Sequence, residues 1–87
     1  MVEETLTFDF NDGNGAVPAH RHANPNGALG GWIANTARVG PTSYVYEHAY
    51  VYGYARVYEQ AEVYGNAYVY GNAHVYGNAE VYEHANP

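Results

Sequence analysis

Cysteine and lysine are absent from this 87-residue sequence, and arginine occurs only three times. Without cysteine, neither a disulfide nor a thiolate metal site can form. Nine acidic residues give a formal net charge of −6 at pH 7. With so few basic residues, we expect no direct nucleic-acid binding and no basic helix on a membrane surface. The longest apolar runs span only a few residues, which excludes a transmembrane helix in this sequence.

Tyrosine, glycine and valine are abundant instead, and they follow a repeat. From residue 31 to residue 84 the sequence divides without a gap into nine six-residue units: GWIANT, ARVGPT, SYVYEH, AYVYGY, ARVYEQ, AEVYGN, AYVYGN, AHVYGN and AEVYEH. Position 1 of each unit is small, and position 3 is Ile or Val. Position 4 is Tyr in the last seven units, and positions 5 and 6 are typical of turns.

The six-residue period predicts short β-strands joined by sharp corners. Positions 1 and 3 lie two residues apart and therefore share one face of a strand. Gly and Asn at the corners tolerate a positive φ. A helix is disfavoured because six residues do not match its period of about 3.6. Identical short strands with identical corners favour a solenoid, in which each coil stacks on the next.

The Ala-x-Val units resemble those of hexapeptide-repeat proteins, which fold as left-handed parallel β-helices of triangular cross-section. The resemblance covers residues 31–84 and implies an all-β chain with a short triangular β-helix of about three coils over residues 31–87. The family often has a small or acidic residue after the aliphatic one, where this chain has Tyr. The Ala-x-Val-Tyr-Gly-Asn form is similar to repeats of bacterial and phage-encoded proteins. We therefore expect a cytoplasmic or a phage-encoded protein, with a virion location left open.

Three units make one coil in this family, so residues 18 apart would stack in columns on three outer faces. At position 2, the first face carries Trp32, Tyr50 and Tyr68, the second Arg38, Arg56 and His74, and the third Tyr44, Glu62 and Glu80. One face is thus aromatic, one basic and one largely acidic. These nine residues are the candidate surface for a partner or for oligomer contacts.

Residues 1–30 precede the repeat, and we predict that they form an N-terminal β cap over the first coil. In order, the expected elements are a half-buried strand over 5–10, a turn over 11–15, a second strand over 16–22 and a loop over 23–30. Pro18 is expected to confine the second strand to a sheet edge. At the other end only residues 85–87 follow the repeat, so we expect a partner to cover the last coil.

Tyrosine burial favours assembly. A single β-helix leaves its position-4 tyrosines on the outside, although burying them would add much stabilising apolar area. We therefore expect a homo-oligomer. The resemblance also implies trimers, in which the Arg/His face of one subunit could meet the Tyr/Glu face of the next.

The Arg38, Arg56 and His74 column has two interpretations. It could recognise a carboxylate or phosphate, or it could match Glu62 and Glu80 of another copy. The tyrosine columns could bind sugars or a protein, or they could stabilise the fold by stacking.

An HxH pair, His20 and His22, would place two imidazoles on one side of a strand. It resembles the iron-binding apex of some phage spike tips, although here the pair lies beside Pro18 and a loop. We predict that the protein binds no metal and no other cofactor. If it did bind a metal, His20 and His22 would be the candidate ligands.

His48 and His84 occupy equivalent corners two coils apart, with Asn66 between them. A separation of roughly two strand spacings is too large for one metal within a chain. Carbonic-anhydrase-like hexapeptide enzymes bind zinc with histidines from two subunits, so pairing with His74 of another copy is an alternative.

The leading hypothesis is a non-enzymatic structural or interaction module, an oligomeric β-solenoid that presents Tyr-rich and charged faces to a protein partner. One alternative is a phage-encoded acidic inhibitor or decoy that acts on a host defence complex, as size and charge indicate. Another is an acyltransferase-like or carbonic-anhydrase-like enzyme. Acyl transfer is the best-known activity of the family, but the repeat has no insertion that could supply a catalytic histidine.

Overall fold

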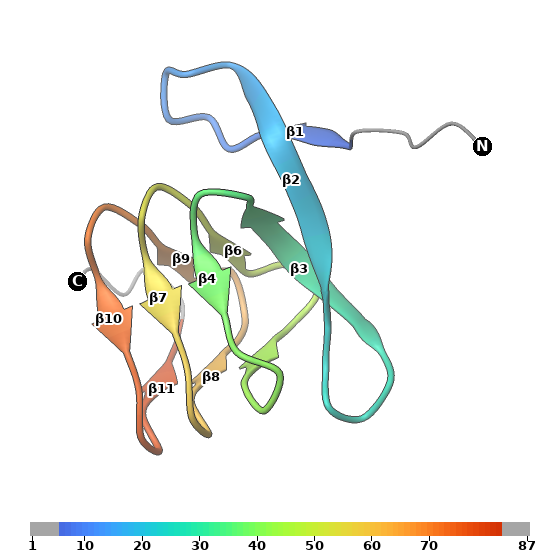
Figure 1. Cartoon of the computed structure of the whole chain (residues 1–87), viewed down its shortest axis with the longest axis vertical. Coiled ribbons are helices and arrows are strands. Elements are labelled where there is room, and N and C mark those ends of the chain that lie inside the picture. Colours follow the sequence, from blue (N-terminus) through green and yellow to red (C-terminus); the bar gives the residue numbers. More distant parts are fainter. Residues whose placement is uncertain (1–5, 83–87) are drawn as a thin grey trace.

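The computed structural model describes residues 6–82, and within them the chain consists of β-strands, turns and bends without any helix (Figure 1). The predicted all-β class is confirmed. Three strands come first, β1 (Thr7–Asp9), β2 (Ala16–Ala23) and β3 (Leu29–Ala34). Eight two-residue strands follow: β4 (Arg38–Val39), β5 (Tyr44–Val45), β6 (Tyr50–Val51), β7 (Arg56–Val57), β8 (Glu62–Val63), β9 (Tyr68–Val69), β10 (His74–Val75) and β11 (Glu80–Val81).

Three sheets share these strands, in the orders β1-β2-β3-β6-β9, β4-β7-β10 and β5-β8-β11. Each strand from β3 to β8 pairs in parallel with the third strand after it, and the paired residues lie 18 apart, as in Trp32 with Tyr50. The chain therefore visits the three sheets in turn, and we call each 18-residue passage a circuit. Figure 1 shows β4, β7 and β10 side by side as one row. The predicted 18-residue stacking of side chains is confirmed by this register.

The small and β-branched residues of the repeat fill the interior between the three sheets. One core cluster holds Ile33, Ala37, Val45, Ala49, Val51, Ala55, Val57, Ala61, Val63, Ala67 and Val69. Burying a valine side chain contributes about 2 kcal/mol, and this gain recurs at Val45, Val51, Val57, Val63 and Val69. In the last circuit Val75 and Val81 are only half-buried, so this end of the core is thinner.

The corners explain the Gly-Asn steps of the repeat. Gly53, Gly65, Gly71 and Gly77 have φ between 65° and 71°, in the left-handed region that favours glycine. Glu59 takes the equivalent corner position with a φ of 61° although it carries a side chain. Its backbone oxygen accepts hydrogen bonds from the hydroxyls of Thr42 and Ser43, at 2.7 and 2.9 Å. These bonds hold a corner that glycine forms elsewhere.

The two predicted N-terminal strands are present as β1 and β2, and Thr5 of the first predicted strand lies outside the described residues. The expectation that Pro18 confines the second strand to a sheet edge is wrong, because β2 lies between β1 and β3. The Pro18 carbonyl accepts a bond of 2.9 Å from Asn35, one residue beyond the end of β3. Because the β2–β3 ladder ends there, the missing N–H of proline removes no interior ladder bond.

The end of β2 and the residue that follows it cover the first strand of the third sheet. The Asn24 side chain donates to the Val45 carbonyl at 3.1 Å and accepts from the Val45 N–H at 2.9 Å. The buried His22 imidazole bonds the Ser43 carbonyl at 2.7 Å. Asn24 thus supplies β5 with the donor and acceptor that a neighbouring strand would supply. Over residues 6–82 the fold includes no helix that could span a membrane.

Candidate functional site

The aromatic column Trp32, Tyr50 and Tyr68 lies in register across β3, β6 and β9. Tyr50 and Tyr68 stack with ring centroids 5.4 Å apart. The N-terminal segment packs over the beginning of this column, because Phe8 stacks on Trp32 at 4.9 Å and lies 5.1 Å from Tyr50. Phe10, which is buried, stacks on Tyr52 at 5.0 Å.

This packing changes the role expected for the first face. Trp32 and Tyr50 belong to a second core cluster formed with Phe10, and they are only partly accessible. Tyr68 is 41% exposed and remains accessible to solvent. Phe8 and Phe10 thus cover the part of this candidate partner surface that Trp32 and Tyr50 form. The alternation of Leu6, Phe8 and Phe10 indicated a half-buried strand, but not which surface the strand would bury.

The third face combines the column Tyr44, Glu62 and Glu80 with a second column, Tyr46, Tyr64 and Tyr82. We call these six residues the Tyr/Glu face. Tyr46 meets Tyr64 edge-on at 5.5 Å, and Tyr64 meets Tyr82 at 4.7 Å. The Tyr64 hydroxyl donates to the Tyr82 hydroxyl at 3.3 Å, which in turn donates to Glu80 Oε1 at 2.6 Å. Ring contacts and hydrogen bonds thus order the side chains on an exposed surface.

The hydrogen bonds of this face shift two ionisation equilibria. The bonds from Tyr82 and Tyr64 stabilise the Glu80 carboxylate and lower its pKa. The pKa of Tyr64 is raised, first by its hydrogen bond to Tyr82 and then by the neighbouring Glu80. Near neutral pH the face therefore carries protonated phenols beside an ionised carboxylate.

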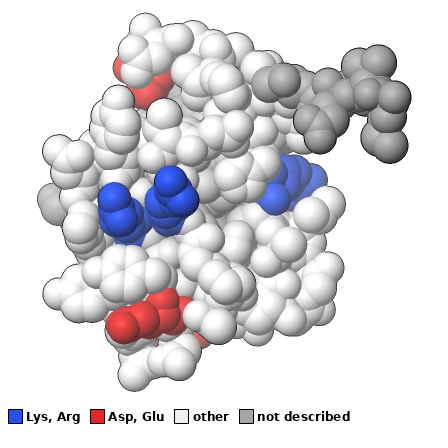
Figure 2. Space-filling view, in the orientation of Figure 1, with Lys and Arg blue, Asp and Glu red and all other residues white. Residues whose placement is uncertain are grey.

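The basic column Arg38, Arg56 and His74 lies in register across β4, β7 and β10. Figure 2 shows arginine side chains next to each other over β4 and β7, with acidic side chains only nearer the top and bottom of that view. All three side chains are exposed. Within residues 6–82 neither Arg38 nor Arg56 has a hydrogen-bond or ion-pair partner for its guanidinium.

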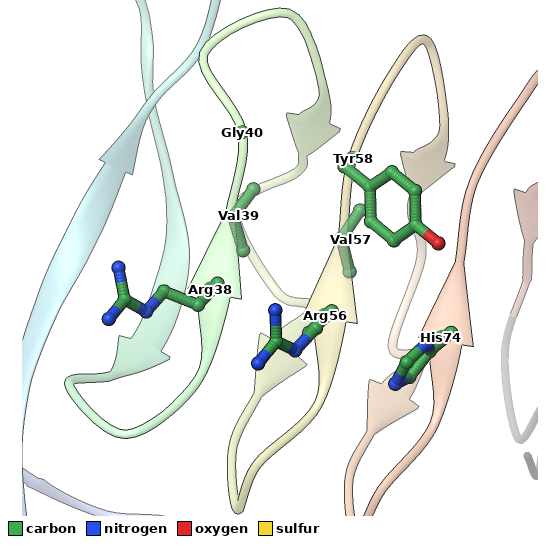
Figure 3. A pocket seen from close by; sticks show the side chains of 7 residues that line it. All are labelled: Arg38, Val39, Gly40, Arg56, Val57, Tyr58 and His74. Carbon is green, nitrogen blue, oxygen red and sulfur yellow. The ribbon is translucent and has the colours of Figure 1, made fainter.

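A groove of about 680 Å³ follows this column, and we call it the arginine groove. Figure 3 shows the side chains that line it: Arg38, Val39, Gly40, Arg56, Val57, Tyr58 and His74. Arg38, Arg56 and His74 extend from the strands as one row, with the Tyr58 ring beside them. Tyr58 is held by two ring contacts, with Tyr76 at 5.4 Å and with His74 at 6.5 Å. Tyr58 was not among the predicted site residues. It occupies position 4 of the unit that contains Arg56, and this placement could have identified it from the sequence.

The HxH pair has structural partners. The exposed His20 bonds the Asn35 side chain through Nδ1 at 2.7 Å, and the buried His22 bonds the Ser43 carbonyl through Nε2. Because a carbonyl oxygen only accepts, Nε2 of His22 carries the proton. Burial lowers the pKa of His22 and keeps its ring neutral, partly offset by the bond to Ser43. In the part of the chain from 6 to 82, no three His, Asp or Glu side chains gather in a way that could hold a metal ion.

His48 is exposed at its corner, and His84 lies outside the described residues, as does the chain end over 83–87. The structure thus places the nine predicted surface residues in three columns but brings no two of the columns together within one chain. In comparisons with known proteins, no family model, no curated protein and no solved structure matches the chain.

Proposed function

We propose that the chain is a short left-handed triangular parallel β-helix of about three coils, and that it serves as a non-enzymatic interaction module. It binds a protein partner through faces of fixed chemistry, and it assembles with copies of itself, a trimer being favoured. The parallel pairing of strands β3 to β11 across three sheets, with an 18-residue register, supports the β-helix. The module function depends on the surface that this register builds.

The observation that carries the proposal is the Tyr/Glu face. Tyr46 and Tyr82 are 36% and 57% exposed, yet both rings are held against Tyr64. Tyrosine is enriched at protein interfaces because it offers a large contact area with only two side-chain torsions to order. Rings already ordered by a ladder lose little further conformational entropy on binding. An exposed but ordered tyrosine ladder therefore suits contact with a protein.

Self-assembly follows from the exposed rings of the Tyr/Glu face. Tyr46 and Tyr82 leave apolar ring surface in solvent, and a second copy that packs against this face removes that surface from water. A contact between unlike faces is heterologous, and it closes into a ring when the rotation between copies is a fraction of a full circle. The triangular section makes a threefold ring the favoured case.

Light scattering coupled to size-exclusion chromatography tests this function with exposed tyrosine variants. We expect the wild-type protein to be a multimer at micromolar concentration, and the double variant Tyr46→Ser/Tyr82→Ser to be a folded monomer there. Tyr54→Ser is the control, because Tyr54 is 68% exposed and lies at a corner outside the Tyr/Glu face. A folded wild-type monomer, or equal dissociation in the control variant, would contradict the proposal.

A further inference from the structure

The arginine groove holds two like charges in neighbouring strands. Arg38 and Arg56 are direct partners in the β4–β7 register, so their backbones lie about 4.8 Å apart. Like charges directly opposite each other across a strand pair are unfavourable. No acidic side chain among residues 6–82 pairs with either guanidinium. Among the residues that the structure describes, these two cations with up to ten N–H donors have no acceptor.

We infer that the arginine groove is a binding site for a small oxyanion ligand, a molecule that carries a phosphate or a carboxylate group. Guanidinium groups donate paired, charge-assisted hydrogen bonds to both kinds of group. An anion between Arg38 and Arg56 accepts from both and removes their mutual repulsion. His74 continues the row by one strand and adds an imidazole within the same lining.

The shape of the groove favours a small ligand. Its volume of about 680 Å³ lies within the range of ligand pockets, which is about 300 to 1,000 Å³. Gly40 follows β4 in the lining and has no side chain, so only its backbone occupies the groove next to Tyr58. The Tyr58 ring, fixed by Tyr76 and His74, provides an apolar wall for the body of the ligand next to the charged row.

A second copy of the chain is a weaker candidate for this groove. Its matching surface would be the acidic column, but Glu80 already accepts the Tyr82 hydroxyl, and Tyr64 adds to its stabilisation. A small anion, by contrast, can bind the two guanidiniums without any change in the hydrogen bonds of Glu80. The net charge of −6 repels anions from the molecule as a whole. Binding of an anion therefore reports a local site and not a general attraction.

Isothermal titration calorimetry at low ionic strength tests the inference, with inorganic pyrophosphate, inorganic phosphate and succinate as separate probes. We expect saturable binding of at least one probe. Arg38→Gln and Arg56→Gln should each weaken it about tenfold or more, because each removes charge-assisted hydrogen bonds. Arg21→Gln is the matched control, since it makes the same charge change at a residue whose Nε donates to Gly30 outside the groove.

The probes also separate the two sources of the oxyanion. Preference for the phosphates assigns a phosphorylated ligand, and an equal response to succinate assigns carboxylates; both support the site. Absence of binding by all three probes, or equal weakening by Arg21→Gln, overturns it. So does a loss of assembly in the two groove variants without any probe binding, because the guanidiniums then serve a second copy. This inference does not rest on the proposed function, which Tyr46→Ser/Tyr82→Ser tests on another face.

Discussion

Glu59 shows at the scale of one residue how the repeat tolerates an exception. It holds a corner at a φ of 61°, where four other corners have glycine. A residue with a Cβ pays roughly 1–2 kcal/mol in that region. Hydrogen bonds offset this strain, since the Glu59 carboxylate accepts from the Gly77 N–H at 2.8 Å and its carbonyl accepts from Thr42 and Ser43.

Two variants of Glu59 separate the strain from the hydrogen bond. Glu59→Ala and Glu59→Gly both lose the carboxylate, but only Glu59→Gly loses the Cβ that disfavours this conformation. We expect Glu59→Gly to be more stable than Glu59→Ala by about 1 kcal/mol in urea denaturation. A Glu59→Ala variant as stable as Glu59→Gly would show that the corner carries no strain.

His22 predicts how stability depends on pH. Its pKa is lowered in the folded protein by burial, so the unfolded chain binds the proton more readily. The stability contribution is complete above the unfolded pKa of about 6.5 and is lost as the pH falls toward the folded value. We expect the melting temperature to fall between pH 7 and pH 5, and to fall less in His22→Gln.

His48→Gln is the control for that measurement, because His48 is exposed at a corner. It should keep the acid sensitivity of the wild-type protein. Glu80 has a lowered pKa and therefore adds its own loss of stability only at more acidic pH, below about 4.5. Equal acid sensitivity in the wild-type protein and in His22→Gln would show that His22 does not cause the loss of stability between pH 7 and pH 5.

At the scale of elements, the N-terminal segment completes what the repeat leaves open. β2 pairs with β3, Phe8 and Phe10 pack over the aromatic column, and Asn24 bonds both backbone groups of Val45. β2 and Asn24 thereby cover β3 and β5, two strands that have no preceding circuit beside them. Such a cover is what the first unit of a stacked repeat requires.

Asn24→Ala measures how much this cover contributes. The change leaves the buried N–H and C=O of Val45 without partners, and each unsatisfied group costs about 1–3 kcal/mol. We expect a loss of about 2–4 kcal/mol in the free energy of unfolding. Asn72→Ala, at an exposed corner of the repeat, should change it by less than about 0.5 kcal/mol. A loss below 1 kcal/mol for Asn24→Ala would mean that water replaces the side chain.

The elements also show what the sequence could predict. The period of six identified the buried Ala and Val positions and the columns of residues 18 apart, because each unit repeats the same local geometry. Asn24 could not be identified in this way, since a single asparagine in the segment after β2 has no periodic signal and acts on a strand 21 residues later. Pro18 was misjudged for a similar reason, because where a ladder ends depends on pairing and not on local propensity.

At the scale of the whole molecule, stacking converts a sequence repeat into three surfaces of different chemistry. The net charge is −6, yet one sheet presents Arg38 and Arg56 side by side while another presents Glu62 and Glu80. The Tyr/Glu face and the arginine groove both exist only because residues 18 apart are neighbours. Both proposals therefore depend on the same register.

Nuclear Overhauser contacts in the NMR spectrum of the protein test that register most directly. The account predicts methyl contacts between Val57 and Val75, and between Val45 and Val63, together with backbone contacts of the parallel type between residues 18 apart. Contacts of the antiparallel type between successive units, six residues apart, would contradict it. In that case the columns, the Tyr/Glu face and the arginine groove would not exist.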